Sequence, residues 1–353
     1  MKSLSTKATS IKPSGIRKFF DLASTMEGVI SLGVGEPDFA TPWHICENAI
    51  HYMSTGHTHY TANRGLLELR EEICKFHKEH YNQIYDPENE VIVTIGGSEA
   101  IDLCMRALLN PGDEVIVLDP NYVAYAPSVI LSDGVVVPLQ LKEENDFKIL
   151  PEDLKKVITP KTKAMIINYP SNPTGGVMTK EDYAKIVDII KESGIYVVSD
   201  EIYAELSFDQ PFASLAQFDE IKSQIIVVNG FSKAYAMTGW RLGYCMANKE
   251  LSSVMNKIHQ YVIMSAPVMS QYAGIEAIKN GYDDVLMMKD DYLKRRNFLV
   301  NRLNRMGLKT NMPHGTFYVF CNIQSTGLDS ETFCEKLLQK QKVACVPGNA
   351  FVQ

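Results

Sequence analysis

The sequence predicts an α/β fold with a mostly parallel, doubly wound sheet that contains one antiparallel strand, plus a smaller α+β domain. Strand-like apolar runs alternate with helix-like segments between residues 90 and 230, which is typical of a parallel sheet covered by helices. The runs 225–229 and 242–247 are joined by a short, glycine-broken connection with no room for a crossover helix, so the second should run antiparallel. After Gly307 a strand over 316–322, a helix over 331–341 and a strand over 343–346 predict the smaller domain.

Composition agrees with a globular protein large enough for two domains. The chain has 353 residues, 45% of them hydrophobic and 22% charged. A net charge of −7 argues against a nucleic-acid binder, and no apolar run approaches the roughly 18 residues that span a bilayer. The seven cysteines form no CxxC pair, so we expect buried thiols in a reducing cytoplasm.

The N-terminal third begins with a polar arm and a helix-like segment over 16–26. Gly33 and Gly35 then break a strand, and helices are predicted over 42–53 and 66–80. His57 and His59 lie between these helices, but no carboxylate or cysteine cluster completes a metal site, so we expect no metal.

The predicted strand 90–95 ends in Gly96-Gly97-Ser98, which leads into a helix over 100–109. Two glycines allow close backbone approach, Ser98 suits a helix N-cap, and the free N–H groups of a first helical turn favour an anion. This turn has the shape of a phosphate cradle, although a strand-Gly-Gly-helix junction is common and is weak evidence alone.

Polar and aromatic residues follow the next strands, which are predicted over 114–118, 135–139, 163–169 and 195–199. Each of these residues also has an ordinary local explanation: core packing for Tyr122, an Asx turn for Asn172 and a helix N-cap for Asp200. Tyr203 can lie on the same side as Asp200 if a helical turn begins there. Ligands bind open α/β sheets at the carboxyl ends of the strands, so we expect these side chains to converge there.

Lys233 follows the buried run 225–228 and lies eight positions before Arg241. An ammonium is costly to bury unless it is paired or neutral, and a desolvated lysine has a lowered pKa and can form an imine with an aldehyde. The ordinary alternative is a surface lysine in a β-turn. Beyond it, helices are predicted over 249–262, 268–280 and 283–306.

Three motifs resemble pyridoxal 5′-phosphate (PLP) aminotransferases of class I/II, the fold-type I group. They are S-K-x-x-x-M-x-G-W-R-x-G at 232–243, S-N-P-T-G at 171–175 and D-E-x-Y at 200–203. The resemblance extends from Ser31 to Phe351 and is nearest to bacterial aromatic or aspartate-type enzymes. It implies an N-terminal arm with part of the small domain over 1–44, a large PLP-binding domain over 45–285 and a small C-terminal domain over 286–353.

The resemblance also implies a role for each candidate site residue. Lys233, Asp200 and Tyr203 would be catalytic: Lys233 carries PLP, Asp200 pairs with its ring nitrogen, and Tyr203 hydrogen-bonds its ring oxygen together with Asn172. Gly35 and Asn172 would hold the substrate carboxylate. The remaining contacts to PLP would come from Tyr122 stacked on the ring, and from Gly97, Ser98, Ser232, Arg241 and, from the partner subunit of a homodimer, Tyr60 at the phosphate.

The implied activity is ping-pong transfer of an amino group from an aromatic, aspartate or alanine-type L-amino acid to a 2-oxo acid such as 2-oxoglutarate. A PLP-dependent C–S β-lyase on the same scaffold shares these residues. A non-catalytic PLP-binding regulatory domain would need a DNA-binding module, which the short N-terminal arm and acidic charge argue against. An unrelated α/β binding protein would not explain the converging motifs.

One departure concerns the C-terminal end. In the resembled family an arginine that clamps the substrate α-carboxylate lies shortly beyond a V-P-G-x-x-F segment. Here that segment is residues 346–351, and the given sequence stops at Gln353. We therefore expect the small domain to be incomplete and this chain to bind PLP but to transaminate poorly.

Overall fold

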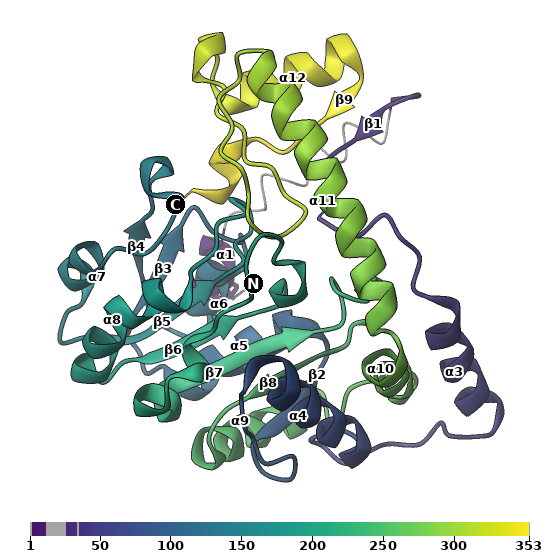
Figure 1. Cartoon of the computed structure of the whole chain (residues 1–353). Coiled ribbons are helices and arrows are strands. Elements are labelled where there is room, and N and C mark those ends of the chain that lie inside the picture. Colours follow the sequence, from purple (N-terminus) through teal and green to yellow (C-terminus); the bar gives the residue numbers. More distant parts are fainter. Residues whose placement is uncertain (1, 12–25, 34, 353) are drawn as a thin grey trace.

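The computed structural model describes residues 2–11, 26–33 and 35–352, so most of the helix predicted over 16–26 lies outside the described residues. Figure 1 shows a large sheet with helices on both faces and a smaller unit at one end, reached by the long helix α11 (Tyr282–Arg305). The predicted domain boundaries after residues 44 and 285 remain a prediction.

Seven described strands form the large sheet in the order β2-β8-β7-β6-β5-β3-β4. Only β8 runs antiparallel to its neighbours β2 and β7, and the other pairs are parallel, which confirms the predicted fold class. The strands are β2 (Val91–Thr94), β3 (Glu114–Asp119), β4 (Val135–Gln140), β5 (Thr162–Asn168), β6 (Tyr196–Asp200), β7 (Ile225–Gly230) and β8 (Gly243–Met246).

The helices lie close to the predicted ranges. Thr179 and Asp182 form a capping box before α8 (Lys180–Ser193), in which the Thr179 N–H donates to Asp182 Oδ2 at 3.2 Å and the Asp182 N–H donates to Thr179 Oγ1 at 3.1 Å. The α-helices in the described part of the chain, apart from α11, lie in the large unit or beside it, except for one in the small unit. They are α1 (Thr6–Ser10), α3 (Trp43–Ser54), α4 (Leu67–Tyr81), α5 (Gly96–Leu108), α6 (Tyr125–Leu131), α7 (Pro151–Val157), α8 (Lys180–Ser193), α9 (Lys249–Val262), α10 (Val268–Asn280) and, in the small unit, α12 (Ser330–Gln341).

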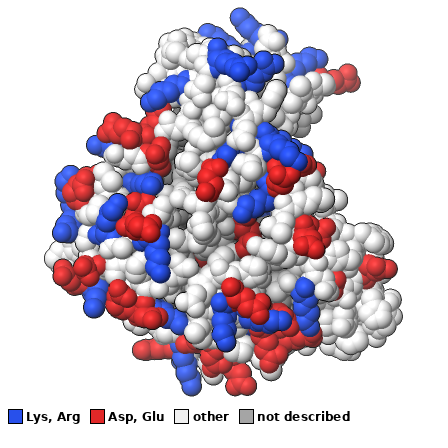
Figure 2. Space-filling view, in the orientation of Figure 1, with Lys and Arg blue, Asp and Glu red and all other residues white. Residues whose placement is uncertain are grey.

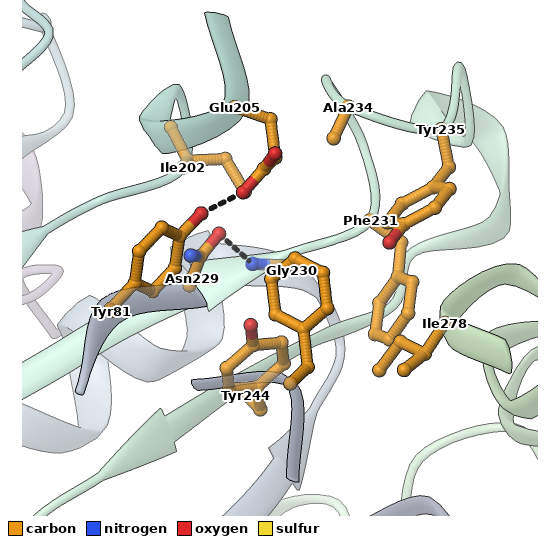
Figure 3. Close-up of a pocket in the computed structure, with 11 residues that line it drawn as sticks. Tyr81, Ile202, Glu205, Asn229, Gly230, Phe231, Ala234, Tyr235, Tyr244 and Ile278 are labelled. Carbon is orange, nitrogen blue, oxygen red and sulfur yellow. Dashed lines mark hydrogen bonds between the residues drawn. The ribbon is translucent and has the colours of Figure 1, made fainter. Parts of the chain in front are cut away.

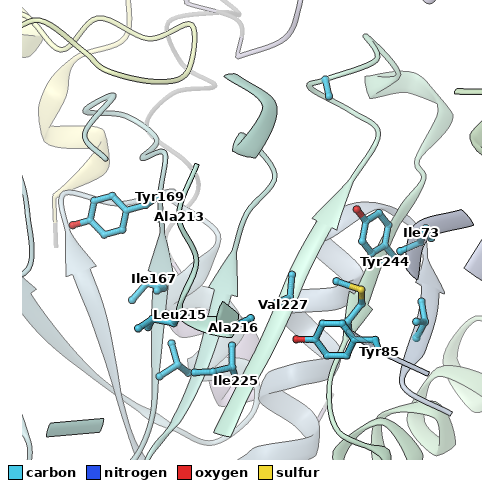
Figure 4. Close-up of a cluster of buried hydrophobic side chains, with 14 of the residues drawn as sticks. Ile73, Tyr85, Ile167, Tyr169, Ala213, Leu215, Ala216, Ile225, Val227 and Tyr244 are labelled. Carbon is cyan, nitrogen blue, oxygen red and sulfur yellow. The ribbon is translucent and has the colours of Figure 1, made fainter. Parts of the chain in front are cut away.

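Both faces of the large sheet are buried along every strand except the edge strand β4. Successive residues of a strand point to opposite faces, and Val227 belongs to one apolar cluster while Val228 belongs to the other. Figure 4 shows the first cluster, in which Ile167, Leu215 and Ile225 pack beside Val227. Burial on both sides explains why these strands are continuous apolar runs. The packed strands hold the sheet edge at which their carboxyl ends lie.

The predicted strand over 316–322 is wrong. Thr316 has a left-handed φ of +64°, and its N–H donates to Leu206 O at 2.9 Å in a loop of the large unit. The Asn322 N–H donates to Lys309 O instead of to a neighbouring strand. The small sheet is formed by β1 (Ile30–Ser31) and β9 (Val343–Ala344), which pair in parallel.

The predicted N-cap at Ser98 is also wrong. Helix α5 begins two residues earlier, at Gly96, whose φ of +70° lets the chain turn directly out of β2. Ser98 therefore lies in the first turn and is exposed, and the Ile95 N–H donates to the Glu99 carboxylate at 2.5 Å. Glu99 thus satisfies the N–H of the N-cap residue Ile95, and no side chain among the described residues caps the first turn of α5.

Charged side chains are spread over the molecular face in Figure 2, where Lys and Arg alternate with Asp and Glu. Among residues 2–11, 26–33 and 35–352 we find no helix with the length and apolarity that a bilayer crossing requires.

Candidate active site

Lys233 follows β7 at the carboxyl edge of the large sheet. Its Nζ is partly buried and donates to Gly35 O at 2.5 Å, which joins the loop before α3 to the lysine. Burial lowers the pKa of Lys233 to about 8, although the negative charges of Glu36 and Asp200 act to raise it. The ordinary alternative of a surface lysine in a β-turn is therefore wrong.

Asp200 ends β6 beside the lysine and is 7% exposed. It accepts hydrogen bonds from the Tyr125 hydroxyl at 2.7 Å and from the Ile202 N–H at 3.2 Å. Burial raises the pKa of this carboxyl to about 6, against the opposite effect of both hydrogen bonds and of the Lys233 charge. The Tyr122 ring meets the Tyr125 ring edge-on, with 5.5 Å between their centroids, so it packs against the tyrosine that donates to this carboxyl group.

Asn172 and Tyr203 meet through a residue that the sequence did not single out, Tyr318. The Tyr318 hydroxyl lies 2.8 Å from the Tyr203 hydroxyl and 3.5 Å from Asn172 Nδ2. The Asn172 N–H donates to Asn168 Oδ1 at 2.8 Å, which fixes the loop after β5. Asn172 is 9% exposed, and its Oδ1 finds no hydrogen-bond partner in the described part of the chain.

The predicted anion cradle lies against Arg241. A Cβ atom on Gly96 would stand 2.7 Å from Arg241 Nη2, so the guanidinium group packs directly on the first turn of α5 that carries Gly97 and Ser98. Arg241 itself has a φ of +52° and donates to Thr238 O at 3.1 Å. Ser232, beside the lysine, is 7% exposed.

Tyr60 is the one predicted site residue that stands apart. Its ring is 84% exposed, and none of the described contacts joins it to the residues around Lys233. Within a single chain, therefore, the structure gathers the other candidates but not Tyr60.

Two hollows flank the Lys233 segment, and they differ greatly in size. Figure 3 shows an enclosed cavity of about 20 Å³ behind the segment, where Glu205, Tyr81 and Tyr235 point inward, and this volume holds little more than one water. An open groove of about 670 Å³ lies on the other side, lined by Arg241, Trp240 and Phe39 among others. Of these two hollows only the groove has room for a small molecule, and its lining includes Arg241 but not Lys233, Asp200, Tyr203 or Asn172.

A family model for aminotransferase class I and II matches residues 27–352, nearly the whole described chain. The chain is a class I and II aminotransferase. The match confirms the resemblance and makes this chain a PLP-dependent transferase, because PLP is the cofactor of this family.

Relatives cover this aminotransferase along almost its full length. A putative aminotransferase of Bacillus subtilis, YugH, is 50% identical over 99% of this chain and 90% of its own. An aspartate aminotransferase of Pyrococcus abyssi is 43% identical over 99% of this chain and 90% of its own. The crystal structure of an aromatic aminotransferase from Pyrococcus horikoshii has a TM-score of 0.90 and 42% identity, covering 96% of this chain and 91% of that one.

The residues of this aminotransferase fit PLP chemically. A lysine with a lowered pKa can react with an aldehyde, a buried carboxyl can pair with a ring nitrogen, and a glycine turn packed under an arginine suits a phosphate. The unpartnered Asn172 Oδ1 shows that the buried polar surface is incomplete without a further group.

Sequence reasoning missed the residues that support the predicted ones. Tyr125 lies three positions after Tyr122, and this spacing at the start of a helix could have suggested that both rings face the same way. Asn168 ends β5 four positions before Asn172, at the sheet edge where a site was already expected. Tyr318 gave no usable signal, because it lies in a segment that was read as a strand.

Proposed function

We propose that this aminotransferase transfers the amino group of an aromatic, aspartate or alanine-type L-amino acid to a 2-oxo acid such as 2-oxoglutarate, in a ping-pong cycle. The proposal rests on one observation. Lys233, with a pKa of about 8, lies at the sheet edge where Asp200, Tyr203 and Asn172 converge. PLP, when bound, supplies the aldehyde and the electron-withdrawing ring that make the substrate Cα–H bond acidic.

Lys233 would hold the cofactor and then move the substrate proton. A pKa of about 8 leaves roughly a tenth of the amine neutral at pH 7, compared with well under a thousandth at the usual lysine pKa of 10.5. The neutral fraction is both the nucleophile and the base. The bond from Nζ to Gly35 O directs the amine toward the loop in which we expect the substrate carboxylate to be held.

Asp200, Tyr203, Asn172 and Tyr122 would fix the ring. Asp200 is largely ionised at neutral pH, since its pKa is about 6, and a carboxylate there stabilises a protonated ring nitrogen. Tyr203 and Asn172 have donors for the ring oxygen, and the second N–H of Asn172 Nδ2 would donate to the substrate carboxylate. Tyr122, on the same side of the site as Tyr125, would stack on the ring.

Arg241 and the first turn of α5 would hold the phosphate. Gly97 and Ser98 lie at the N-terminal end of the helix, where backbone N–H groups point outward and the helix dipole favours an anion. Arg241 adds a charge-assisted contact beside them, and Ser232 adds a hydroxyl. Tyr60 of the partner subunit would complete the contacts.

A homodimer in the reducing cytoplasm is the second part of the proposal. Large apolar side chains are exposed on two helices near the turn that carries Tyr60. Trp43, at the start of α3, is 67% exposed, and Tyr261, at the end of α9, is 86% exposed. Met264 O accepts from Asn63 Nδ2 at 2.8 Å, so the chain just after α9 adjoins the turn that carries Tyr60. We propose that these exposed apolar side chains form the interface between the two subunits. All seven cysteines are free thiols, which suits a reducing compartment.

The first test is an absorbance spectrum of the purified chain before and after borohydride, followed by mass mapping of the modified lysine. We expect the cofactor to be fixed on Lys233. A chain that takes up no PLP would contradict the proposal.

The second test is a half-reaction with one amino acid and no acceptor. Ping-pong transfer predicts one equivalent of 2-oxo acid per site, and turnover only after 2-oxoglutarate is added. Phenylalanine, aspartate and alanine as donors distinguish the side-chain classes. Pyruvate and ammonia released from a cysteine conjugate, without any transfer, would favour the β-lyase.

A further inference from the structure

The Tyr318 hydroxyl is the point at which three separate site segments meet. It lies 2.8 Å from the Tyr203 hydroxyl and 3.5 Å from Asn172 Nδ2. A Cβ atom on Gly35 would overlap Tyr318 Oη, so the hydroxyl also packs against the loop that accepts from Lys233. These partners come from the loops after β6, after β5 and before α3, and all of them were predicted to contact the cofactor or the substrate.

The segment that carries Tyr318 is attached to two of the same loops. The N–H groups of His314 and Gly315 both donate to Gly175 O, at 3.0 and 3.1 Å, in the turn that contains Asn172. The Thr316 N–H donates to Leu206 O at 2.9 Å, three residues beyond Tyr203. The position of Tyr318 is therefore tied to the loops whose side chains it contacts.

The backbone before Tyr318 adopts a conformation that its sequence does not favour. Thr316 is β-branched and 1% exposed, and its φ is +64°, which is a genuine outlier for such a residue. Its Oγ1 accepts from the Tyr318 N–H at 3.1 Å. Conformations of this kind persist only where the surroundings determine them, and they cluster at functional sites.

Either phenol of the Tyr203–Tyr318 pair can be the donor, and one of the two directions leaves the Tyr203 proton free for the site. The Asn172 amide nitrogen can only donate, so Tyr318 Oη is its acceptor. In that direction the single proton of Tyr318 is donated to Tyr203 Oη, 2.8 Å away. The Tyr203 proton is then left to point into the site. Burial raises the pKa of Tyr318 to about 12 and that of Tyr203 well above its usual value, so both phenols keep their protons.

We propose that Tyr318 is a positioning residue that donates to Tyr203 and thereby directs the Tyr203 proton toward the ring oxygen of the bound cofactor. The inference rests on the proposed function. A donor that itself accepts a hydrogen bond is polarised and becomes a stronger donor. The titratable groups that face the Tyr203–Tyr318 pair are Asp200, Tyr122 and Tyr125, while Lys233 Nζ lies 5.8 Å from the Tyr203 ring centroid.

The test is Tyr318→Phe, with the pH midpoint of the visible absorbance change of bound cofactor as its readout. A donor to the ring oxygen stabilises the deprotonated form, so a weaker donor should raise the midpoint, on the order of half a pH unit. Tyr292→Phe is the matched control. Tyr292 packs 5.4 Å from Phe317 in the same aromatic cluster, but its hydroxyl finds no partner among the described residues. Its midpoint should not move.

A double-mutant cycle with Tyr203→Phe shows whether Tyr318 acts through Tyr203. If it does, Tyr318→Phe should add no shift in the Tyr203→Phe background. The melting temperature of the cofactor-free variants identifies any general loss of folding. An unmoved midpoint in Tyr318→Phe, an equal shift in Tyr292→Phe or fully additive shifts would each overturn this inference while wild-type cofactor binding stands. A wild-type chain that binds no cofactor would overturn the proposed function and this inference together.

Discussion

Lys233 and Asp200 have opposite pKa shifts with the same cause. Burial lowers the pKa of the amine to about 8 and raises that of the carboxyl to about 6, and in both cases it outweighs the attraction between the two charges. The charged form of each group is therefore less stable in the folded chain than it would be in water. Such perturbed pairs are typical of functional sites, where stability is given up for reactivity.

This cost should be measurable in the cofactor-free protein by replacing Lys233 with Met. The unfolded chain keeps the lysine proton up to about pH 10.5, whereas the folded chain releases it near pH 8. Between these values the unfolded state binds more protons, so raising the pH stabilises the folded wild type, by up to about 3 kcal/mol. The free energy of unfolding of wild type minus that of Lys233→Met should therefore increase between pH 8 and 10.5.

Denaturant unfolding at several pH values measures this difference. Lys191→Met, at an exposed position of α8, controls for the loss of a lysine and should give a difference that does not vary with pH. A constant difference for Lys233→Met as well would show that the buried ammonium carries no such penalty.

Site residues could be predicted from the sequence where their residue type is unusual for their position. Asp200 ends one buried apolar strand and Lys233 follows another, and a charge is costly in such places unless it has a use. Tyr125 and Tyr318 are ordinary tyrosines in ordinary surroundings, and their importance comes from contacts made across 75 and 115 positions of the chain. No local pattern reports a contact of that range.

At the scale of elements, the strands of the large sheet were predictable because helices cover both of its faces. Such strands are continuous apolar runs, and their carboxyl ends locate the site. Residues 316–322 have a similar composition but lie where no neighbouring strand is available, and their backbone groups bond to loops instead. Strand pairing is a property of the tertiary structure, so composition alone could not exclude this segment.

The junction between β2 and α5 should depend on the absence of a side chain at Gly96. Gly96→Ala would force the positive φ on alanine and push its Cβ atom against Arg241 Nη2. A charge-assisted hydrogen bond is worth about 1.5–3 kcal/mol, so the Kd for PLP should rise roughly tenfold to a hundredfold. Equilibrium titration of the cofactor-free protein with PLP measures this change.

Gly194→Ala separates backbone strain from the contact with Arg241. Gly194 has a φ of +69°, almost the same as Gly96, but a Cβ atom there would meet nothing within 4 Å. Both variants should lose about 1 kcal/mol of stability, and only Gly96→Ala should bind PLP more weakly. Equal affinities in the two variants would remove the proposed role of the cradle.

At the scale of the whole molecule, a single chain leaves the site open. The groove beside Arg241 is open to solvent, and Tyr60 stands on the surface rather than in the site. Apolar side chains of α3 and the end of α9 are exposed as well, so one surface would bury them and deliver Tyr60 at the same time. A twofold-symmetric dimer uses the same patch on both subunits, and each subunit could then complete the site of the other.

Mixing two inactive variants tests this arrangement directly. Lys233→Ala lacks the lysine but keeps Tyr60, and Tyr60→Ala has the opposite defect. If Tyr60 acts across the interface, a mixed dimer has one site with neither residue and one site with both. Random exchange of equal amounts makes about half of the dimers mixed, so about a quarter of all sites should regain wild-type affinity for PLP. PLP titration of the mixture, before and after subunit exchange, measures this fraction. A mixture that behaves as the average of the two separate variants would mean that Tyr60 does not complete a partner's site.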